Sequence, residues 1–264
     1  MNDCRQEWYD AAAKVKVTVV DATDASQKLV NAHLCGPVAG YYLSKALCGA
    51  ALLGAELSES DETLVVQMKC SGPLGGFNVE CTAAGTLRGY VEKKALDDFD
   101  GLVRQPISRA DGKKIVGEAR IQVTRTVPGR ILSQGVSNSF DGYLAGSLQR
   151  KAVMFTDART SDEAEVLYAR GVMVECLPDA PGTEALSADF GDISVSPRRI
   201  LARAGLSGAE LRRTDPISFA CRCSPERAAA TIAALGESDR AGLPPVLDVT
   251  CHMCGRTYSI STAT

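Results

Sequence analysis

Four cysteines near the C-terminal end are the residues of this chain best suited to chemistry. Cys221 and Cys223 are separated by one residue, and Cys251 and Cys254 form a C-x-x-C motif, with residues 224–250 between the two pairs. Zinc binds four thiolates tetrahedrally at roughly 2.3 Å each, and closely spaced cysteine pairs are how structural zinc sites are built. The spacing therefore predicts that these four cysteines bind one Zn²⁺ per chain.

The same motif offers little to a zinc enzyme. His252 stands between Cys251 and Cys254 and could replace a sulfur, but we expect it to point away from the metal. A zinc deaminase needs a His-x-Glu motif and an open coordination position, whereas four sulfurs close the site. The chain has two histidines in total, so the usual general bases are scarce. We see no acid–base pair, Ser-His-Asp set or nucleotide fingerprint, and we expect no enzymatic activity.

The elements that must carry these cysteines form a small unit over residues 217–264. Ser224-Pro225 predicts the N-cap and first turn of a helix. Val246–Val249 predicts a strand, and Tyr258 and Ile260 continue a second strand after a tight turn. A unit of this size with little apolar bulk does not easily fold alone. We therefore expect metal binding and folding of this unit to be coupled.

Residues 1–176 are predicted to form an α+β body with a mostly antiparallel sheet and few helices. Apolar alternation and short apolar runs between turn residues predict strands, and apolar residues at three- and four-residue spacing predict helices. The strands are expected at Lys14–Val20, Leu64–Cys70, Phe77–Thr82, Leu87–Val91, Ile115–Arg125, Ala152–Thr156 and Val166–Cys176. The helices are expected at Pro37–Leu57 and Asp141–Lys151, while residues 1–13 and 93–113 receive no element.

The remaining cysteines and the other histidine suggest no second site. His33 precedes a predicted helix with no second His, Asp or Glu at ligand spacing, so we expect a surface or capping role for it. Six cysteines stand singly among apolar neighbours and are interpreted as small core or half-exposed residues. They are Cys4, Cys35, Cys48, Cys70, Cys81 and Cys176.

Between the body and the cysteine unit lies a connector, residues 177–216, of different character. It is rich in Ala, Gly and charge, with 11 charged residues in 40. Ser196-Pro197 predicts a helix start, and behind it Ile200, Leu201 and Ala204 form only a thin apolar stripe. We predict a helical, marginally stable connector that opens first, because few apolar contacts hold it. The alternative is an ordinary solvated helix between domains.

Charge and hydropathy limit the partners of the chain. The formal net charge of −3 shows no basic excess, which argues against a protein that neutralises nucleic-acid phosphates. The cysteine unit carries four Arg and four acidic residues, so four thiolates and one Zn²⁺ would leave it near −2. The most apolar run, Ala46–Ala55, is half of the ~20 residues that cross a bilayer. The N-terminus lacks signal or transit character. We expect a cytoplasmic protein with no nucleic-acid or membrane partner.

Zinc-bound thiolates can also be oxidised. Cys221 and Cys223 are close enough in sequence to form a disulfide with each other, as are Cys251 and Cys254. Oxidant could therefore expel the metal and unfold the unit, which would make the cluster a switch. The simpler alternative is an inert zinc site that only holds the unit together.

The cysteine unit contains Phe219-x-Cys221-x-Cys223-Ser224-x-Glu226-Arg227, Leu235-Gly236, Cys251-x-x-Cys254 and Tyr258. The body contains Gly72-Pro73-Leu74-Gly75, Arg88-Gly89-Tyr90 and the segment from Gly171 to Leu177-Pro178. In these motifs the sequence resembles the heat-shock protein 33 family of redox-regulated chaperones. The order and spacing of these motifs run through nearly the whole chain. Two departures concern Leu148, where the family has an acidic residue, and Cys70, where it has glycine.

The resemblance implies an ATP-independent holdase that is inactive when reduced and zinc-bound. Oxidation would form the two local disulfides, release zinc, unfold the cysteine unit and destabilise the connector. Apolar surface would then bind unfolding client proteins, and the oxidised form would be a homodimer while the reduced form is a monomer. Two rival functions stay open: a zinc-stapled module that binds protein or nucleic acid in its reduced form, and an enzyme with an open zinc site.

Overall fold

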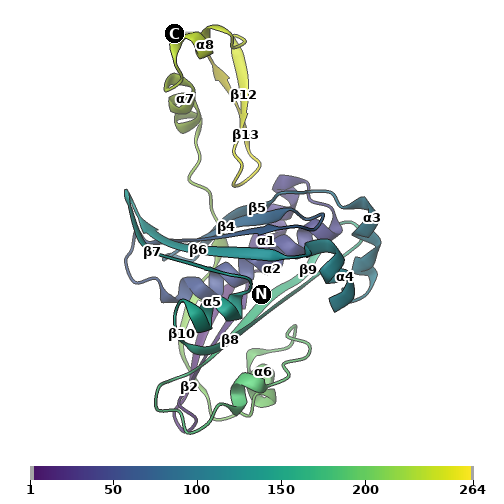
Figure 1. The fold of residues 1–264 in the computed structure, drawn as a ribbon, viewed down its shortest axis with the longest axis vertical. Coiled ribbons are helices and arrows are strands. Elements are labelled where there is room, and N and C mark those ends of the chain that lie inside the picture. The colour runs from purple at the N-terminus through teal and green to yellow at the C-terminus, as the bar shows by residue number, and fades with distance from the viewer. Residues whose placement is uncertain (1–2, 263–264) are drawn as a thin grey trace.

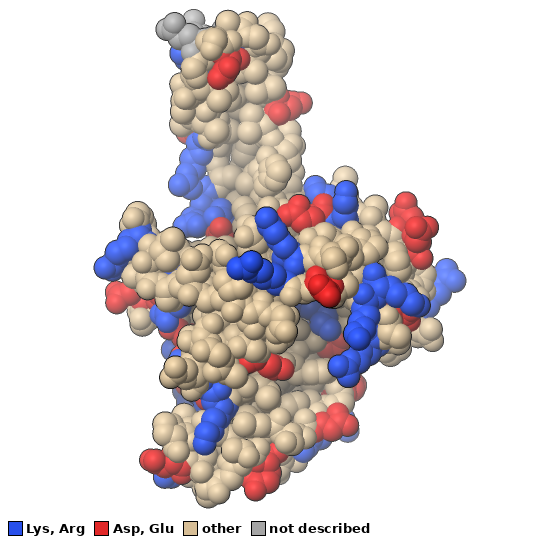
Figure 2. Space-filling model, viewed as in Figure 1, with Lys and Arg blue, Asp and Glu red and all other residues tan. Residues whose placement is uncertain are grey.

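The computed structural model describes residues 3–262, which fold into three sheets and several short helices. Two of the sheets are mostly antiparallel and form a layered body, and a two-stranded sheet belongs to a unit that projects from it (Figure 1). The predicted α+β class is therefore confirmed. Figure 2 shows acidic and basic side chains interspersed over the face that it displays, in keeping with the small net charge.

The first body sheet has five strands in the order β10-β1-β2-β9-β8. Its members are β1 (Cys4–Asp10), β2 (Val15–Asp21), β8 (Lys151–Thr160), β9 (Val166–Cys176) and β10 (Glu210–Pro216). The sequence predicted β2 and β9 closely. It left β1 unassigned, and it placed the end of β8 in a loop, because pairing with β9 rather than local pattern carries that strand to Thr160.

The second body sheet has six strands in the order β11-β5-β4-β3-β6-β7. Its members are β3 (Thr63–Cys70), β4 (Gly76–Thr82), β5 (Thr86–Val91), β6 (Ala119–Val127), β7 (Arg130–Ser137) and β11 (Ser218–Phe219). The β3-β4-β5 meander agrees with the sequence prediction. β11 is the parallel member, since Ser218 and Phe219 pair with Thr86 and Leu87.

Two helices fill the space between the body sheets. They are α1 (Thr23–His33) and α2 (Pro37–Leu53), the latter continued by the 3-10 turn η1 (Gly54–Glu56). α2 packs against strands of both sheets, and its side chains are at the centre of the main core. The stretch Pro37–Glu56 is long and apolar enough to span a membrane, but 83% of its most apolar part is buried inside the fold. Its apolar character is that of a core helix.

The segment before β6 corrects the sequence prediction. Residues 93–113, left without an element, contain α3 (Asp97–Asp100), the 3-10 turn η2 (Gly101–Arg104) and most of α4 (Arg109–Val116). Ser108 caps α4 by accepting the N–H of Asp111, and Gly117 ends it at φ +64°. Ile115 therefore lies in a helix and not in the predicted strand.

The second predicted helix is shorter than expected. It was predicted over Asp141–Lys151, whereas α5 spans Phe140–Gly146 and Lys151 is the first residue of β8.

The connector is helical only in part, which corrects another prediction. Within residues 177–216, the 3-10 turn η3 (Glu184–Ser187) and α6 (Pro197–Arg203) are helical, while Glu210–Pro216 is strand β10. β10 pairs antiparallel with β1, from Cys4 opposite Pro216 to Tyr9 opposite Glu210. Long-range pairing of this kind overrides the weak local pattern of a charged edge strand.

The cysteine unit follows the sequence prediction closely. It contains α7 (Pro225–Ala233), α8 (Glu237–Ala241) and a hairpin of β12 (Val246–Thr250) and β13 (Thr257–Ser261). Ser224 caps α7 by accepting the N–H of Arg227, and Pro225 occupies its first turn. In Figure 1 the unit rises above the body, and the turn joining its two strands faces β5 and α1.

Candidate metal centre

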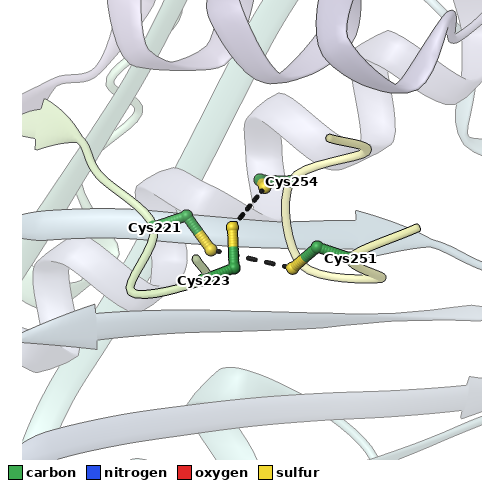
Figure 3. Close-up of side chains that lie close together, drawn as sticks. All are labelled: Cys221, Cys223, Cys251 and Cys254. Carbon is green, nitrogen blue, oxygen red and sulfur yellow. Dashed lines mark hydrogen bonds between the residues drawn. The ribbon is translucent and has the colours of Figure 1, made fainter. Parts of the chain in front are cut away.

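The four cysteines predicted as ligands converge on one point. All four Sγ atoms lie within 4.8 Å of one another (Figure 3). The Sγ atoms of Cys221 and Cys251 are 3.8 Å apart, and those of Cys223 and Cys254 are 3.4 Å apart. Cys254 is buried, and the other three are half-buried. The structure thus brings together two motifs that the sequence separates.

This arrangement fits a tetrahedral metal ion with four sulfur ligands. Zn–S bonds of ~2.3 Å in a regular tetrahedron place neighbouring sulfurs about 3.8 Å apart. The Cys221–Cys251 separation of 3.8 Å equals that value, and the Cys223–Cys254 separation of 3.4 Å is about 0.4 Å shorter. The other Sγ atoms, all within 4.8 Å of one another, need only a small side-chain adjustment. Four thiolates would fill the coordination sphere of such an ion, so the donor set suits a structural metal and leaves no position for substrate.

Backbone pairing positions the first cysteine motif. Cys221 follows β11 closely, and the N–H of Ala220 donates to the carbonyl of Leu87 in β5. The motif therefore leaves the edge of the body sheet next to β5. It ends at Ser224, where the cap of α7 turns the chain away.

A tight turn, residues 251–255, positions the second motif. The N–H groups of Cys254 and Gly255 both point back to the carbonyl of Cys251, and Cys251 donates to the carbonyl of Arg256. Gly255 has φ +70°, and a Cβ there would lie 2.2 Å from the carbonyl oxygen of Ala32. Glycine is thus required both by the left-handed turn and by the close approach of α1.

The same turn docks on the body. The N–H of Gly89 in β5 donates to the carbonyl of Met253 at 3.0 Å. Nε2 of His33 lies 2.9 Å from the carbonyl of Gly89, beneath this contact. His33 is buried at 3% exposure in the last turn of α1, which corrects the expected surface position. Burial lowers the pKa of His33, so the ring is neutral at pH 7.

His252 points away from the sulfurs, as predicted. Its ring lies edge-on against Tyr90, with the ring centroids 5.8 Å apart. Because Tyr90 belongs to β5, this contact adds an aromatic pair to the docking of the turn on the body.

Charge and hydrogen bonding differ among the four sulfurs. Nη1 of Arg88 lies 3.6 Å from Sγ of Cys221, and the hydroxyl of Tyr258 lies 3.2 Å from Sγ of Cys223. Burial raises the pKa of the Cys221 thiol, but the backbone N–H of Cys223 and the Arg88 guanidinium outweigh it and bring the pKa to about 7. Burial raises the pKa of Cys251. The Arg88 guanidinium therefore favours the thiolate form of Cys221, which is the form that binds a metal ion.

The six other cysteines lie apart from this centre as free thiols. Cys35, Cys48, Cys81 and Cys176 are buried, and Cys4 and Cys70 are half-buried. Burial raises the pKa of Cys35 and of Cys81 to about 11. A thiol that stays protonated at pH 7 is a poor nucleophile and a poor metal ligand.

Sequence reasoning did not assign site roles to Arg88 or His33. Arg88 and Cys221 are 133 residues apart, and no local pattern connects them. The available signal was the Arg88-Gly89-Tyr90 stretch, which was part of the family resemblance without a role of its own.

Comparison with known proteins gives a consistent picture. A family model described as "Hsp33 protein" matches residues 3–261. The "33 kDa chaperonin" of Symbiobacterium thermophilum is 30% identical, over 95% of this chain and 92% of that protein. A "33 kDa chaperonin" of Thermus thermophilus is 28% identical, over 94% of this chain and 81% of that protein. The crystal structure of the heat shock protein 33 homologue from Thermotoga maritima superposes with a TM-score of 0.83 at 20% identity, covering 99% of this chain and 96% of that one.

Proposed function

Since the chain belongs to the Hsp33 protein family, we propose that it is a molecular chaperone switched on by oxidation of its four-cysteine centre. Its curated relatives carry the name chaperonin, which supports a chaperone and not an enzyme. In the reduced form, Cys221, Cys223, Cys251 and Cys254 hold one Zn²⁺, and the protein is inactive. Zinc supplies the link between two motifs that otherwise belong to a small, weakly packed unit.

The observation that carries the proposal is a second hydrophobic core between the connector and the five-stranded sheet. One face of that sheet packs on α1 and α2, and the connector covers the other face. The sheet contributes Trp8, Val15, Val17, Val19, Val172, Val174 and Cys176. The connector contributes Ala185, Phe190, Ile193, Ile200, Leu201, Leu206 and Ala209. Release of the connector would expose both apolar sets, and such a surface suits unfolding proteins.

The connector and the metal centre are adjacent along the chain, which supports their coupling. β10 ends at Pro216, β11 follows at Ser218, and Cys221 comes two residues after β11. Loss of the metal would free the short β11 from β5 and remove the anchor that follows β10. The end of β10 would then be held by its pairing with β1 and by the Arg5–Asp215 ion pair.

The sequence predicts few apolar contacts for the connector, whereas Ile193, Ile200 and Leu206 are buried in the second core. We therefore propose that the connector opens because its anchor at the cysteine unit is lost.

The oxidation step consumes two equivalents of peroxide. One thiolate of each motif attacks the peroxide O–O bond, forms a sulfenic acid and releases hydroxide. The second thiolate of the motif attacks that sulfur, forms the disulfide and expels a second hydroxide, and four protons taken from solvent convert the released hydroxides to water. The products would be Cys221–Cys223 and Cys251–Cys254 disulfides. With no thiolate left, the centre cannot hold the ion.

We propose functional units at residues 1–176, 177–216 and 217–264, although β10 shares the sheet of the first. The oxidised form would be a homodimer that holds unfolding clients without ATP, and the reduced form a monomer. A cytoplasmic location and the lack of nucleic-acid or membrane partners belong to the same proposal, and the small net charge supports the lack of a nucleic-acid partner.

The test is a client-aggregation assay with a thermally unfolded protein as client. We expect the reduced, zinc-loaded chain to leave aggregation unchanged and the peroxide-treated, zinc-free chain to suppress it. A chain with all four cysteines replaced by serine controls for metal loss without disulfides. A client that aggregates equally with the zinc-free, oxidised chain would contradict the proposal. Binding of a partner only in the reduced form would favour a fixed zinc-stapled binding module instead.

A further inference from the structure

We infer that Arg88, in strand β5 of the body, is an outer-sphere residue of the metal centre that controls how firmly the metal is held. The inference rests on the proposed four-thiolate metal centre and assigns part of its regulation to a residue outside the cysteine unit. Arg88 would act through Cys221, so it is a positioning residue and not a metal ligand.

The geometry places a charged donor against one ligand sulfur. Nη1 of Arg88 lies 3.6 Å from Sγ of Cys221, a normal separation for an N–H group that donates to a large, diffuse acceptor. The Arg88 side chain is 16% exposed, so solvent screens the contact weakly.

Glu80 in β4 fixes the direction of this guanidinium. Nε of Arg88 donates to Oε2 of Glu80 at 2.7 Å, and the Glu80 side chain is 14% exposed. Glu80 and Arg88 face each other across the β4–β5 pair. Arg222 reaches the same Oε2 from the cysteine unit at 3.2 Å, but its side chain is 53% exposed. Arg88 is therefore held in place before the unit docks.

The positive charge of Arg88 should stabilise the metal-bound form of the centre. Four thiolates and one divalent cation carry a net charge of −2, and a guanidinium beside one sulfur stabilises that excess. A hydrogen bond to a ligand thiolate also withdraws electron density from the sulfur, which makes it less nucleophilic toward an oxidant. Such outer-shell partners contribute substantially to the affinity of metal sites.

The donors to the first cysteine motif have different origins. Cys223 faces the hydroxyl of Tyr258, which belongs to the cysteine unit and moves with it. Cys221 faces Arg88, which belongs to the body. Lifting the unit off β5 would therefore remove the charged side-chain donor from Cys221, which would keep only the backbone N–H of Cys223. The Tyr258 hydroxyl would stay beside Cys223. Docking on the body would thus protect the centre, and any stress that loosens the docking would make Cys221 more reactive and the metal easier to lose.

The experiment measures zinc affinity in the full-length reduced chain by competition with a chromophoric chelator. R88A should bind Zn²⁺ about 10- to 100-fold more weakly than the unmodified chain, the usual effect of losing an outer-shell partner. R222A is the matched control, because it removes an equal charge from the same carboxylate without touching a sulfur. It should weaken binding less than about fivefold. R88K retains the charge without the planar donor and should fall between the two.

The absorption spectrum of bound Co²⁺ distinguishes a change at the sulfur from a general loss of stability, which would not shift the band. In Co²⁺-loaded R88A, the sulfur-to-cobalt charge-transfer band should shift to longer wavelength, since the Cys221 sulfur becomes more electron-rich. Equal affinity and identical spectra for R88A and R222A would overturn the inference. Failure of the unmodified chain to bind either ion would instead contradict the proposed metal centre itself. Should R88A not fold, E80Q tests the same contact, and unchanged affinity and spectrum in E80Q would also overturn it.

Discussion

The guanidinium of Arg198 lies over the indole ring of Trp8, 5.1 Å from the ring centroid. Arg198 belongs to α6 of the connector, and Trp8 to β1 of the body. Trp8 is 5% exposed and is part of the second core. The one tryptophan of the chain therefore reports whether the connector covers the sheet.

Trp8 fluorescence should follow the proposed switch. Peroxide treatment under mild heat should shift the emission to longer wavelength and increase quenching by acrylamide, because release of the connector exposes the ring to water. The four-cysteine to serine variant, measured without zinc, separates metal loss from oxidation. An emission spectrum that stays constant while zinc is released would show that the connector does not open.

Arg170 should hold the connector closed. Its guanidinium is paired with Asp21 in β2 and donates to the connector carbonyls of Ile193, Ser194 and Val195. R170A should destabilise the connector by about 2 kcal/mol, since hydrogen bonds from a charged, half-buried group are lost. We expect faster proteolysis within residues 177–216 and partial chaperone activity without oxidant.

The control for R170A is R159A. Arg159 lies on β8 of the same sheet, and its side chain is exposed. R159A should leave both protease sensitivity and aggregation suppression unchanged. Equal behaviour of the two variants would mean that the Arg170 contacts do not restrain the connector.

Glu56 should make the body sensitive to acid. Lys16 and Arg150 both pair with its carboxylate, at 2.8 and 2.9 Å. Burial raises the pKa of Glu56, but these two cations outweigh it and lower the pKa from 4.5 to about 2. The lowered pKa stabilises the fold fully above about pH 5. That contribution is lost as the pH falls toward 2.

E56Q tests this contribution. At pH 7 it should lower the free energy of unfolding by about 2 kcal/mol, since Lys16 and Arg150 each lose one of two carboxylate partners and keep only Glu175. The difference between the variant and the unmodified chain should shrink below about pH 5 and be nearly gone at about pH 2. Denaturant titrations at several pH values measure the difference, and a constant difference down to pH 2 would contradict the assignment.

The sequence predicted correctly those parts of the fold that depend on short-range residue patterns. The cysteine spacing, the Ser224-Pro225 helix start and the alternation in β2 all depend on neighbours within a few residues, and each is present in the structure. Reliance on local pattern also explains why the strand predicted at Ile115 is wrong. Local alternation favoured a strand, but the cap at Ser108 and the end at Gly117 place Ile115 in a helix.

The rest depends on contacts between distant parts of the chain. β10 becomes a strand because β1 offers it an edge, although its own residues are mostly charged and exposed. His33 is buried because the cysteine turn docks over it, which its sequence neighbours do not indicate. The cysteine motifs therefore identified the centre, while its contact with Arg88 and β5 emerged only from the three-dimensional arrangement.

The central claim is that losing the metal opens the chaperone. The most direct test measures bound zinc per chain, disulfide connectivity and client aggregation in the same samples during peroxide treatment. We predict one Zn²⁺ per reduced chain, its loss in step with Cys221–Cys223 and Cys251–Cys254 disulfides, and suppression of aggregation that rises as zinc falls. Complete zinc release with both disulfides formed and no suppression of aggregation would contradict the account.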